Sequence, residues 1–516
     1  MNTLTPPQAP QTAAPPDPAT VRVRRIGIHT YQEPVIYMHA DCAVCRSEGF
    51  EAESRVRITC AGRSMEATLN VVTSDLLSTD EAALSESAWL LLGAEEGAWV
   101  RLSHPEPLES FAQVRAKLYG ATLDEGALRA VVRDVAAQRY TAIQVAAFVA
   151  ACAGGRMNPG EVLGLTRAMV DAGERLAWPR TPVVDKHCVG GLPGNRTTPI
   201  VVAIVAACGL LIPKTSSRAI TSPAGTADAM ATLAPVDLDV EQMRAVVERE
   251  GGCVVWGGAV RLSPADDILI RVERPLDLDS EAQLVASVLS KKVAAGSTHV
   301  VIDVPVGPTA KVRTAAAADA LGGALLEVGA ALGLWVGVIR TDGSQPVGRG
   351  IGPALEARDV VAVLSGAPDA PADLRERAVL LSGAVLEAGG AAPAGGGAAL
   401  AAATLEEGRA WTKFQAICRA QGGMREPPRA THTRPVLALT AGRVAAVDNR
   451  RLARAAKLAG APAAPAAGAL MHARMGDLVE RGQPLFTLHA ATPGELAYAG
   501  RYVDAGPPIM DVREDG

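Results

Sequence analysis

The chain contains few aromatic side chains: Phe, Tyr and Trp together make up 3% of its 516 residues. Because hydrophobic residues as a whole reach 48%, the cores must be built mainly from Ala, Val and Leu. Long apolar runs are also missing. The run Pro199–Ile212 is too short for a transmembrane helix and is broken by Gly209. We therefore expect no membrane-spanning segment and no membrane partner.

No single sign of charge dominates the sequence. Charged residues make up 20% of the chain, and the formal net charge is −5. This balance argues against a general nucleic-acid-binding protein, although it allows a local basic pocket. The first 20 residues are rich in Pro, Ala and Thr and lack the apolar core of a signal peptide, so residues 1–20 are expected to form a disordered tail.

The eight cysteines show no spacing typical of a disulfide framework, which favours a reducing, cytoplasmic location. One Cys-x-x-Cys pair, Cys42 and Cys45, lies near His39. A zinc or redox site needs further ligands or a thioredoxin-like context, and neither accompanies this pair. Two reduced structural cysteines are the favoured interpretation, with zinc or redox chemistry as the alternative.

The length suggests about three or four domains, and the pattern of apolar residues divides the chain accordingly. The fold class predicted is multi-domain α/β: a helical domain and a mostly parallel α/β domain with a cleft between them, flanked by β-rich domains. The expected ranges are a β-rich domain at 21–103, a helical domain at 104–178 and 275–296, an α/β domain at 179–274 and 297–430, and a β-rich lobe at 431–516.

Strands and helices alternate after Thr181, which is typical of a parallel sheet. The Gly/Ala/Pro-rich segment 389–403 is interpreted as a surface linker or loop. The predicted strands are Pro182–Val184, Leu210–Ile212, Cys253–Trp256, Val300–Val304 and Leu334–Ile339, and the helices between them are Thr198–Cys208, Val240–Glu250 and Arg313–Leu332.

The segment Val183–Thr198, VVDKHCVGGLPGNRTT, predicts a strand, a cationic glycine-rich loop and a helix start. Glycines let backbone N–H groups approach a ligand, and a helix N-terminus favours an anion. Lys186 adds a positive charge. Because this lysine precedes the glycines, the loop is not a Walker loop, and no dinucleotide-binding glycine motif is present. The loop is predicted to bind an oxyanion, most simply phosphate.

A second loop, Lys214–Thr226, contains six hydroxyls, one lysine and one arginine within thirteen residues. It follows a predicted strand, and open α/β sheets bind ligands at the carboxyl ends of their strands. Hydroxyls and Arg suit phosphate or sugar oxygens. The alternative is a Ser/Thr-rich loop that only caps the next helix.

Two further segments supply polar side chains. Ser280 begins a capping box ahead of a helix, on which Ser287 and Lys291 lie four residues apart and share a face. A hydroxyl beside an ammonium can bind the carbonyl edge of a base, although an ordinary exposed helix face is an equal alternative. Lys311 follows the strand Val300–Val304 and is either a second cation in the cleft or a solvated lysine.

Together the motifs DKHxxGG, SSRAITSPAGTAD, PADD, DLDS, ASVLSKK and DVPVGPTAK resemble the thymidine and pyrimidine-nucleoside phosphorylase family over residues 105–500. The N-terminal domain and the motif variants PGN and SRAITSPAGT resemble the longer branch of this family, which includes bacterial thymidine phosphorylase-type proteins and archaeal AMP phosphorylases. The resemblance implies a helical and an α/β domain that close by hinge motion, a C-terminal β-rich lobe and a homodimer. It implies small-molecule nucleoside or nucleotide and phosphate as ligands. Neither cofactor nor metal is expected, since inorganic phosphate is a substrate.

The resemblance also implies roles for individual residues. Lys186 and Asp279 match catalytic positions, with Asp279 as the proton donor. Arg218, Ser287, Lys291 and Lys311 match positions that contact the nucleoside or its base. The positions that match phosphate or nucleotide contacts are Lys186, Gly191, Ser216, Ser217, Arg218, Ala219, Ile220, Thr221, Ser222 and Thr226.

Two departures from the family pattern concern specificity. Cys188 stands where thymidine phosphorylases usually carry serine. The base-binding arginine of the shorter members has no unambiguous match, although Arg271 and Arg274 flank its expected position. Asp279 also lies at a helix start, where the helix dipole lowers a carboxyl pKa, so a proton donor there requires burial to raise the pKa again.

The reaction expected from these features is phosphorolysis of thymidine, giving thymine and 2-deoxyribose 1-phosphate. The alternative within the same class is phosphorolysis of AMP, CMP or UMP, giving the base and ribose 1,5-bisphosphate. A more remote alternative is a non-catalytic nucleotide sensor on the same scaffold.

Overall fold

The computed structural model describes residues 17, 19–31, 33–219, 222–260, 262–276, 278 and 280–514. Most of the predicted tail lies outside these residues, although Thr20 already belongs to a strand. The chain divides into two units: the first comprises residues up to Phe111 with Ala137–Gln144, and the second comprises Ala112–Ala136 with Val145–Gly516. Each unit is described by itself. Within the described residues, no helix is both long and apolar enough to cross a membrane.

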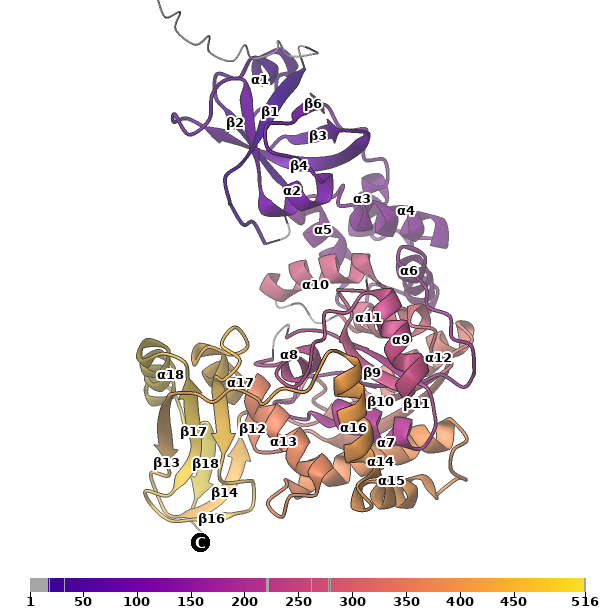
Figure 1. Cartoon of the computed structure of the whole chain (residues 1–516), viewed down its shortest axis with the longest axis vertical. Helices are drawn as coiled ribbons and strands as arrows, with labels where there is room; N and C mark the ends of the chain where they lie inside the picture. The colour runs from indigo at the N-terminus through magenta and orange to yellow at the C-terminus, as the bar shows by residue number, and fades with distance from the viewer. Residues whose placement is uncertain are drawn as a thin grey trace, which may run out of the picture. The chain divides into compact units, whose positions relative to one another are not determined.

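The first unit is a closed six-stranded β-barrel, drawn in indigo and violet in Figure 1. A β-rich domain was expected in this part of the chain, and the structure shows that its strands close into a barrel and that two short helices accompany them. Cys42 and Cys45 are buried in the barrel core. Its elements are β1 (Thr20–Arg25), β2 (Val35–His39), α1 (Ala43–Glu48), β3 (Arg55–Cys60), β4 (Arg63–Val72), β5 (Glu81–Leu84), α2 (Glu86–Leu92) and β6 (Trp99–Ser103).

The second unit contains a parallel sheet of two hydrogen-bonded parts. The order β11-β10-β7 continues, through a parallel bridge between Val183 and Leu211, into β8-β9. All the pairings are parallel, as the alternating pattern predicted. The strands are β7 (Val184–Cys188), β8 (Ile212–Ser216), β9 (Gly252–Trp256), β10 (His299–Val306) and β11 (Trp335–Asp342).

Strands β7 and β8 end at Cys188 and Ser216, and the predicted ends at Val184 and Ile212 are wrong. The prediction stopped each strand at its last apolar residue. The residues that follow include Asp185 and Lys214, which are buried and paired across the two strands at 3.3 Å. Because each charge is neutralised by another strand, these polar residues belong to the sheet interior despite their hydropathy.

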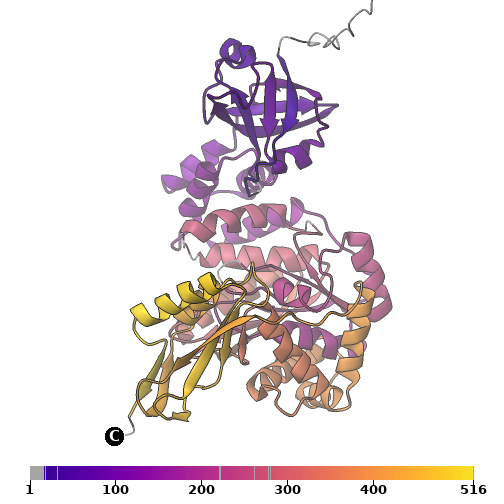
Figure 2. The same ribbon diagram turned by 60° about the vertical axis from the view of Figure 1, so that its left-hand side comes forward.

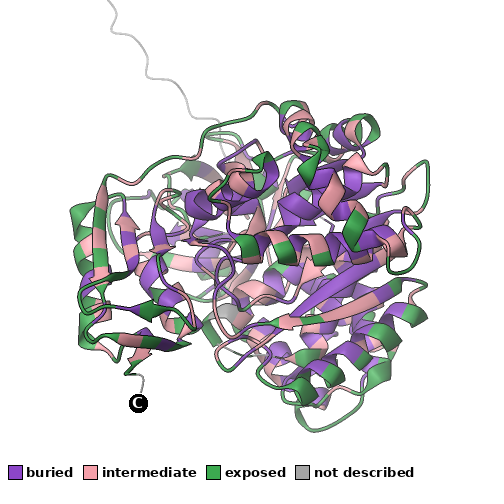
Figure 3. Cartoon of the chain, turned by 90° about the horizontal axis from the view of Figure 1, so that it is seen from below, coloured by how far each residue is buried: buried purple, intermediate pink, exposed green. Residues whose placement is uncertain are grey.

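Helices cover both faces of this sheet, and successive residues of β10 point to opposite sides. Val301 packs with α7, α13, α14 and α16, whereas Val300 and Ile302 pack with α6, α11 and α12. Figure 3 shows the central strands as buried, with exposed residues on the outer helix faces. The helices are α6 (Pro159–Asp171), α7 (Thr197–Ala207), α11 (Glu281–Ala294), α12 (Ala315–Ala331), α13 (Pro353–Ser365), α14 (Ala372–Ala388) and α16 (Arg409–Ala420).

Helix α11 returns to the helical part of the unit, as predicted, and packs on α6. The preceding helix α10 joins it there by packing on α4 and α6. The remaining helices before the C-terminal part are α3 (Phe111–Leu118), α4 (Glu125–Ala136), α5 (Ala142–Cys152), α8 (Thr226–Ala231), α9 (Val240–Glu250) and α10 (Pro264–Leu276).

The segment 389–403, interpreted as a linker or loop, is partly helical. Helix α15 (Gly397–Glu406) begins within it and packs on α14. A Cβ atom on Gly383 would lie 2.6 Å from the backbone nitrogen of Ala398. The small residues therefore allow two helices to approach closely, and the interpretation as a linker was wrong because low complexity here reflects tight packing.

The C-terminal part consists of two sheets with the orders β12-β15-β17-β13 and β16-β14-β18. Figure 2 shows helix α18, in yellow, beside these strands. Strand β12 comes from the chain ahead of α13, far from the other strands in sequence. The elements are β12 (Gly350–Ile351), β13 (His432–Leu437), β14 (Gly442–Val447), α17 (Asn449–Leu458), β15 (Gly468–Met471), β16 (Leu478–Val479), β17 (Pro484–Ala490), α18 (Pro493–Ala505) and β18 (Met510–Arg513).

Candidate active site at the carboxyl edge of the parallel sheet

Lys186 lies inside strand β7 and not in the loop where the sequence placed it. Its side chain is fully buried, and Nζ donates a hydrogen bond of 2.7 Å to Oγ1 of Thr197, at the start of α7. Burial lowers the pKa of Lys186. Because the ammonium group of Lys186 lies beside the first residue of α7, its positive charge adds to the potential of the helix N-terminus, which itself favours an anion.

The loop that follows β7 requires its glycines. Gly190, Gly191 and Gly194 all have positive φ angles, of 88°, 81° and 69°. A Cβ atom on Gly191 would lie 2.5 Å from Cβ of Lys311. The loops after β7 and β10 are thus in contact. From β7 the chain continues to β8 on one side, and from β10 it continues to β11 on the other side. Open α/β sheets bind ligands at such a point, where the strand order reverses.

Cys188 occupies the position at which a serine was expected from the family. Its Sγ accepts a hydrogen bond of 3.3 Å from Nδ2 of Asn195, which also donates to Asp303 at 3.2 Å. Thr341 donates to the other oxygen of Asp303 at 2.6 Å. Burial raises the pKa of the Cys188 thiol to about 12, so this side chain is a neutral thiol at physiological pH.

Arg196 connects the first and second loops, and the sequence analysis missed it. Its Nη1 donates to Oγ1 of Thr226 at 2.7 Å, and its Nη2 donates to the carbonyl oxygen of Ala224 at 2.9 Å. Its Nε donates to the buried carboxylate of Glu356 at 2.7 Å. The position of Arg196 directly before the helix start at Thr197 was the available signal.

The second loop is held by Asp228, on the first turn of α8. One carboxylate oxygen accepts hydrogen bonds from the backbone nitrogens of Ala219, at 2.6 Å, and Gly225, at 2.8 Å. The hydroxyl of Ser216 is buried without a hydrogen-bond partner among the described residues, as expected for a group whose partner is a ligand. Ser222 donates to the carbonyl oxygen of Ala224 at 2.8 Å.

Other predicted residues of this loop differ in what they contact. The backbone carbonyl of Ser217 accepts a bond from the nitrogen of Ala227 at 3.2 Å. The guanidinium of Arg218 lies 4.9 Å above the ring of Trp256 and donates to Asp237 at 2.9 Å. Its charge is thus already paired by a carboxylate. Two other predicted members of this loop lie outside the described residues, namely Ile220 and Thr221.

The predicted pair on helix α11 is present. Lys291 Nζ donates to Oγ of Ser287 at 3.0 Å and to Oδ2 of Asp266 at 2.6 Å. Asp266, which the sequence analysis did not single out, is buried near the start of α10. The side chain of Ser280 accepts a bond of 3.4 Å from the nitrogen of Gln283 and caps α11. The predicted capping box is incomplete, because the side-chain amide of Gln283 has no hydrogen-bond partner among the described residues. Asp279, the predicted proton donor, lies outside the described residues.

His187 follows Lys186 on β7 and feels the charges of four lysines. Burial lowers its pKa well below 6.5, and the charges of Lys292, Lys214, Lys291 and Lys186 lower it further. The cation of β7 and the cation of α11 therefore both act on one imidazole, which stays neutral. The carboxyl edge of the sheet concentrates positive charge, an arrangement suited to anionic ligands.

A buried ion cluster lies beside this histidine. The carboxylate of Asp185 forms ion pairs with Lys292 of α11, at 2.7 Å, and with Lys214 of β8, at 3.3 Å. All three side chains are almost completely buried. The cluster joins β7, β8 and α11, which are the three elements that carry Lys186, the second loop and the Ser287–Lys291 pair.

Comparison with known proteins was made for the whole chain. Three family models match: the glycosyl transferase family, helical bundle domain, over residues 114–173; the glycosyl transferase family, a/b domain, over 180–411; and the pyrimidine nucleoside phosphorylase C-terminal domain over 443–510. A solved structure, the anthranilate phosphoribosyltransferase of Thermus thermophilus, matches with a TM-score of 0.49 and 21% identity, over 60% of this chain and 98% of that chain.

Curated relatives match over nearly their whole length. A Polaromonas protein (strain JS666) named "putative thymidine phosphorylase" is 67% identical over 96% of this chain and 98% of its own. An Acidovorax protein (strain JS42), "putative thymidine phosphorylase 1", is 65% identical over 96% and 97%. A Legionella pneumophila protein, also named "putative thymidine phosphorylase", is 60% identical over 93% of this chain and 93% of its own.

The matched domains define this protein as a glycosyltransferase, an enzyme of the pentosyltransferase class. More narrowly, the chain belongs to the thymidine and pyrimidine-nucleoside phosphorylase family. The resemblance drawn from the sequence motifs is therefore confirmed.

Proposed function

We propose that the chain catalyses phosphorolysis of a pyrimidine nucleoside, with thymidine and phosphate giving thymine and 2-deoxyribose 1-phosphate. The observation that carries the proposal is the buried ion pair between Asp185 and Lys292, whose charged atoms lie 2.7 Å apart. These residues directly precede Lys186 on β7 and follow Lys291 on α11, so the pair ties the anion-favouring loop to the element that carries the Ser–Lys–Asp cluster. The names of the relatives support thymidine as the substrate.

In the proposed reaction, a phosphate oxygen attacks the anomeric carbon of the sugar, and the bond from this carbon to the base nitrogen breaks. The electron pair leaves with the base while positive charge develops on the sugar. The loop after β7, the N-terminus of α7 and Lys186 attract the phosphate. Arg196 orients the hydroxyl of Thr226, which is 2.7 Å away. Such fixed groups lower the barrier because they need no reorganisation during the reaction.

The leaving base is assigned to helix α11. Lys291 and Ser287 lie 3.0 Å apart, close enough to bind neighbouring polar atoms of a pyrimidine. The carboxylate of Asp266 fixes the ammonium of Lys291 at 2.6 Å. The positive charge opposes the negative charge that grows on the base as the bond breaks. We keep Asp279 as the proposed proton donor.

The test is a substrate panel assayed for release of free base in the presence of phosphate. We expect thymidine to be cleaved, and cleavage of AMP without any cleavage of thymidine would overturn the choice of substrate. Binding without base release from any substrate would instead support a nucleotide sensor. Lys291→Met should lower kcat strongly. Lys413→Met, a matched change at a lysine paired with Glu250, should leave kcat unchanged.

The second candidate is phosphorolysis of a nucleoside 5′-monophosphate to the base and ribose 1,5-bisphosphate. It is favoured by the contact between Gly191 and Lys311, which places a second lysine against the loop after β7. A second cation there suits a second phosphate group. In the panel, this candidate predicts that AMP, CMP or UMP has a higher kcat/KM than the matching nucleoside.

A further inference from the structure

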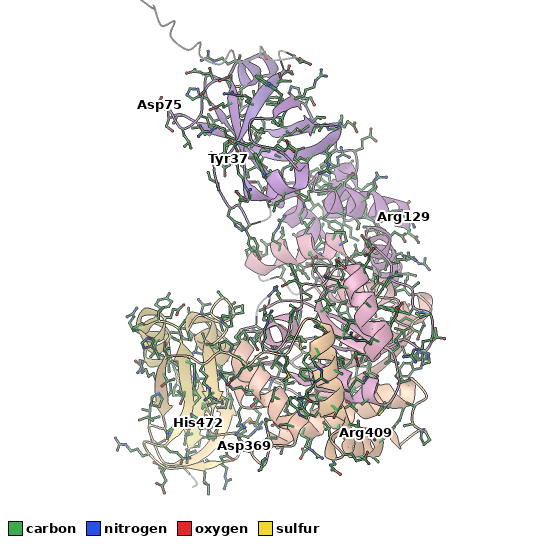
Figure 4. All side chains as sticks on the ribbon, viewed as in Figure 1. Tyr37, Asp75, Arg129, Asp369, Arg409 and His472 are labelled. Atoms are coloured by element: carbon green, nitrogen blue, oxygen red, sulfur yellow. The ribbon has the colours of Figure 1, made fainter. Side chains whose placement is uncertain are left out.

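A cavity of about 480 Å³ lies in the second unit, away from the residues assigned to catalysis. It is lined by α13, by residues 429–430 of the segment that leads to β13, and by the ends of β15 and β17, and it is open to solvent on one side. Figure 4 labels two of its lining residues, Asp369 and His472, near the C-terminal sheets. Sites for small molecules typically have volumes of about 300–1,000 Å³ and combine apolar walls with a few polar groups.

The cavity walls carry three arginines and only two carboxylates. Arg349 lies 3.3 Å from Asp369 and 3.8 Å from Asp359, so both carboxylates are used by one arginine. Arg358 donates to backbone carbonyls, those of Pro427 at 3.2 Å and Pro428 at 2.6 Å. Uncharged carbonyl oxygens orient this guanidinium but do not neutralise its charge.

The third arginine is Arg429, which is exposed and makes no hydrogen bond or ion pair with the described residues. Arg429 and Arg358 nevertheless line the same cavity. Burial and the charge of Arg429 lower the pKa of Arg358, and the carboxylate of Glu426 raises it. Two like charges on one cavity wall repel each other, and Glu426 does not line this cavity. Their arrangement is typical of sites that bind a phosphate group.

A histidine of the cavity wall also lacks a hydrogen-bond partner. Atom Nε2 of His489, on β17, is buried without a hydrogen-bond partner among the described residues. Burial lowers the pKa of His489, and Arg358 and His472 lower it further. A buried polar atom without a partner destabilises the protein, because it has lost its hydrogen bonds to water and gained none in return. This cost is relieved when a ligand supplies the missing acceptor.

We propose that this cavity binds the phosphate group of a small molecule through Arg358, Arg429 and His489. The apolar part of the wall, which includes Leu355 and Met471, takes the uncharged part of the ligand. The site is separate from the proposed active site and does not depend on the proposed function. Orthophosphate and a small phosphate ester share the required chemistry, and the experiment below distinguishes them.

The experiment is equilibrium dialysis of the full chain against radiolabelled orthophosphate and, separately, ribose 5-phosphate. We expect two binding sites per chain for at least one probe, one in the active site and one in the cavity. Arg429→Gln should weaken binding at one site by about 10-fold or more, since it removes a charge-assisted hydrogen bond. Because Arg429 is exposed and has no described partner, this variant should fold normally.

Arg425→Gln is the matched control, because it removes the same charge from the same segment at a residue that does not line the cavity. It should bind both probes as the unaltered protein does. A loss confined to ribose 5-phosphate identifies a phosphate ester as the ligand, and a loss confined to orthophosphate identifies the free anion. Equal binding by the two variants for both probes would overturn the proposal, whereas a single site that Arg429→Gln weakens and Arg425→Gln does not would support the cavity and count against the active site.

Discussion

The buried cluster around Asp185 allows a quantitative test of what holds the site elements together. Its carboxylate, 1% exposed, neutralises Lys292 at 2.7 Å and Lys214 at 3.3 Å, whose side chains are 2% and 5% exposed. Asp185→Asn removes this charge but keeps the shape, so Lys214 and Lys292 lose their counter-charge and must stay buried as unpaired ammonium groups or give up a proton. Breaking a buried ion pair in this way costs about 3–5 kcal/mol. We expect a loss of this size in the free energy of unfolding, measured by urea denaturation.

Two further variants test the reasoning. Adding Lys292→Met to Asp185→Asn removes one of the two unpaired charges and should recover part of the lost stability. Asp319→Asn breaks an exposed ion pair with Arg340 of 2.9 Å, and exposed pairs contribute about 0–1 kcal/mol. If Asp185→Asn costs no more than Asp319→Asn, the cluster does not stabilise the fold and the argument from burial is refuted.

Three other predictions concern the loops and the pH dependence of stability. Gly191→Ala should raise the KM for phosphate by about 10-fold or more. The new Cβ atom would lie 2.5 Å from Lys311, and the positive φ costs a non-glycine residue about 1–2 kcal/mol. Gly190→Ala, whose Cβ atom would have no neighbour within 4 Å, should have the smaller effect, and equal KM values for the two variants would contradict this prediction. Cys188 should resist alkylation by iodoacetamide in the native protein at neutral pH, because its pKa of about 12 keeps it a thiol; rapid labelling of this residue, seen by mass spectrometry, would show the opposite. Burial lowers the pKa of Lys292 from 10.5 to about 7. Between these pH values the unfolded chain binds more protons than the folded chain, so the free energy of unfolding should rise with pH. Urea denaturation across this pH range measures the rise, which Lys292→Met should abolish.

Local spacing predicted the parts of the site that lie on one element. Ser287 and Lys291 are four residues apart, and the structure places them 3.0 Å from each other. Alternation of strands and helices likewise predicted a parallel sheet, because parallel strands need crossover connections. Such signals depend only on the period of a helix or on the order of elements along the chain.

Features that depend on distant partners were missed or misplaced. Lys186 was assigned to a loop because a lysine within an apolar strand is costly unless a partner such as Thr197 accepts a hydrogen bond from it. The importance of Arg196 rests on Glu356, which follows 160 residues later in the chain. The closure of the N-terminal barrel depends on the pairing of β1 with β6, which no local pattern shows.

Strand β12 has a consequence for any attempt to separate the C-terminal part from the rest. Residues Gly350 and Ile351 form one edge of the sheet β12-β15-β17-β13, yet they precede α13 in the chain. A fragment that begins near residue 431 would lack this strand and expose the backbone of β15. An unpaired strand edge of this kind promotes aggregation. The fragment should therefore become soluble as a monomer only when a peptide containing residues 350–351 is supplied in trans or fused to it.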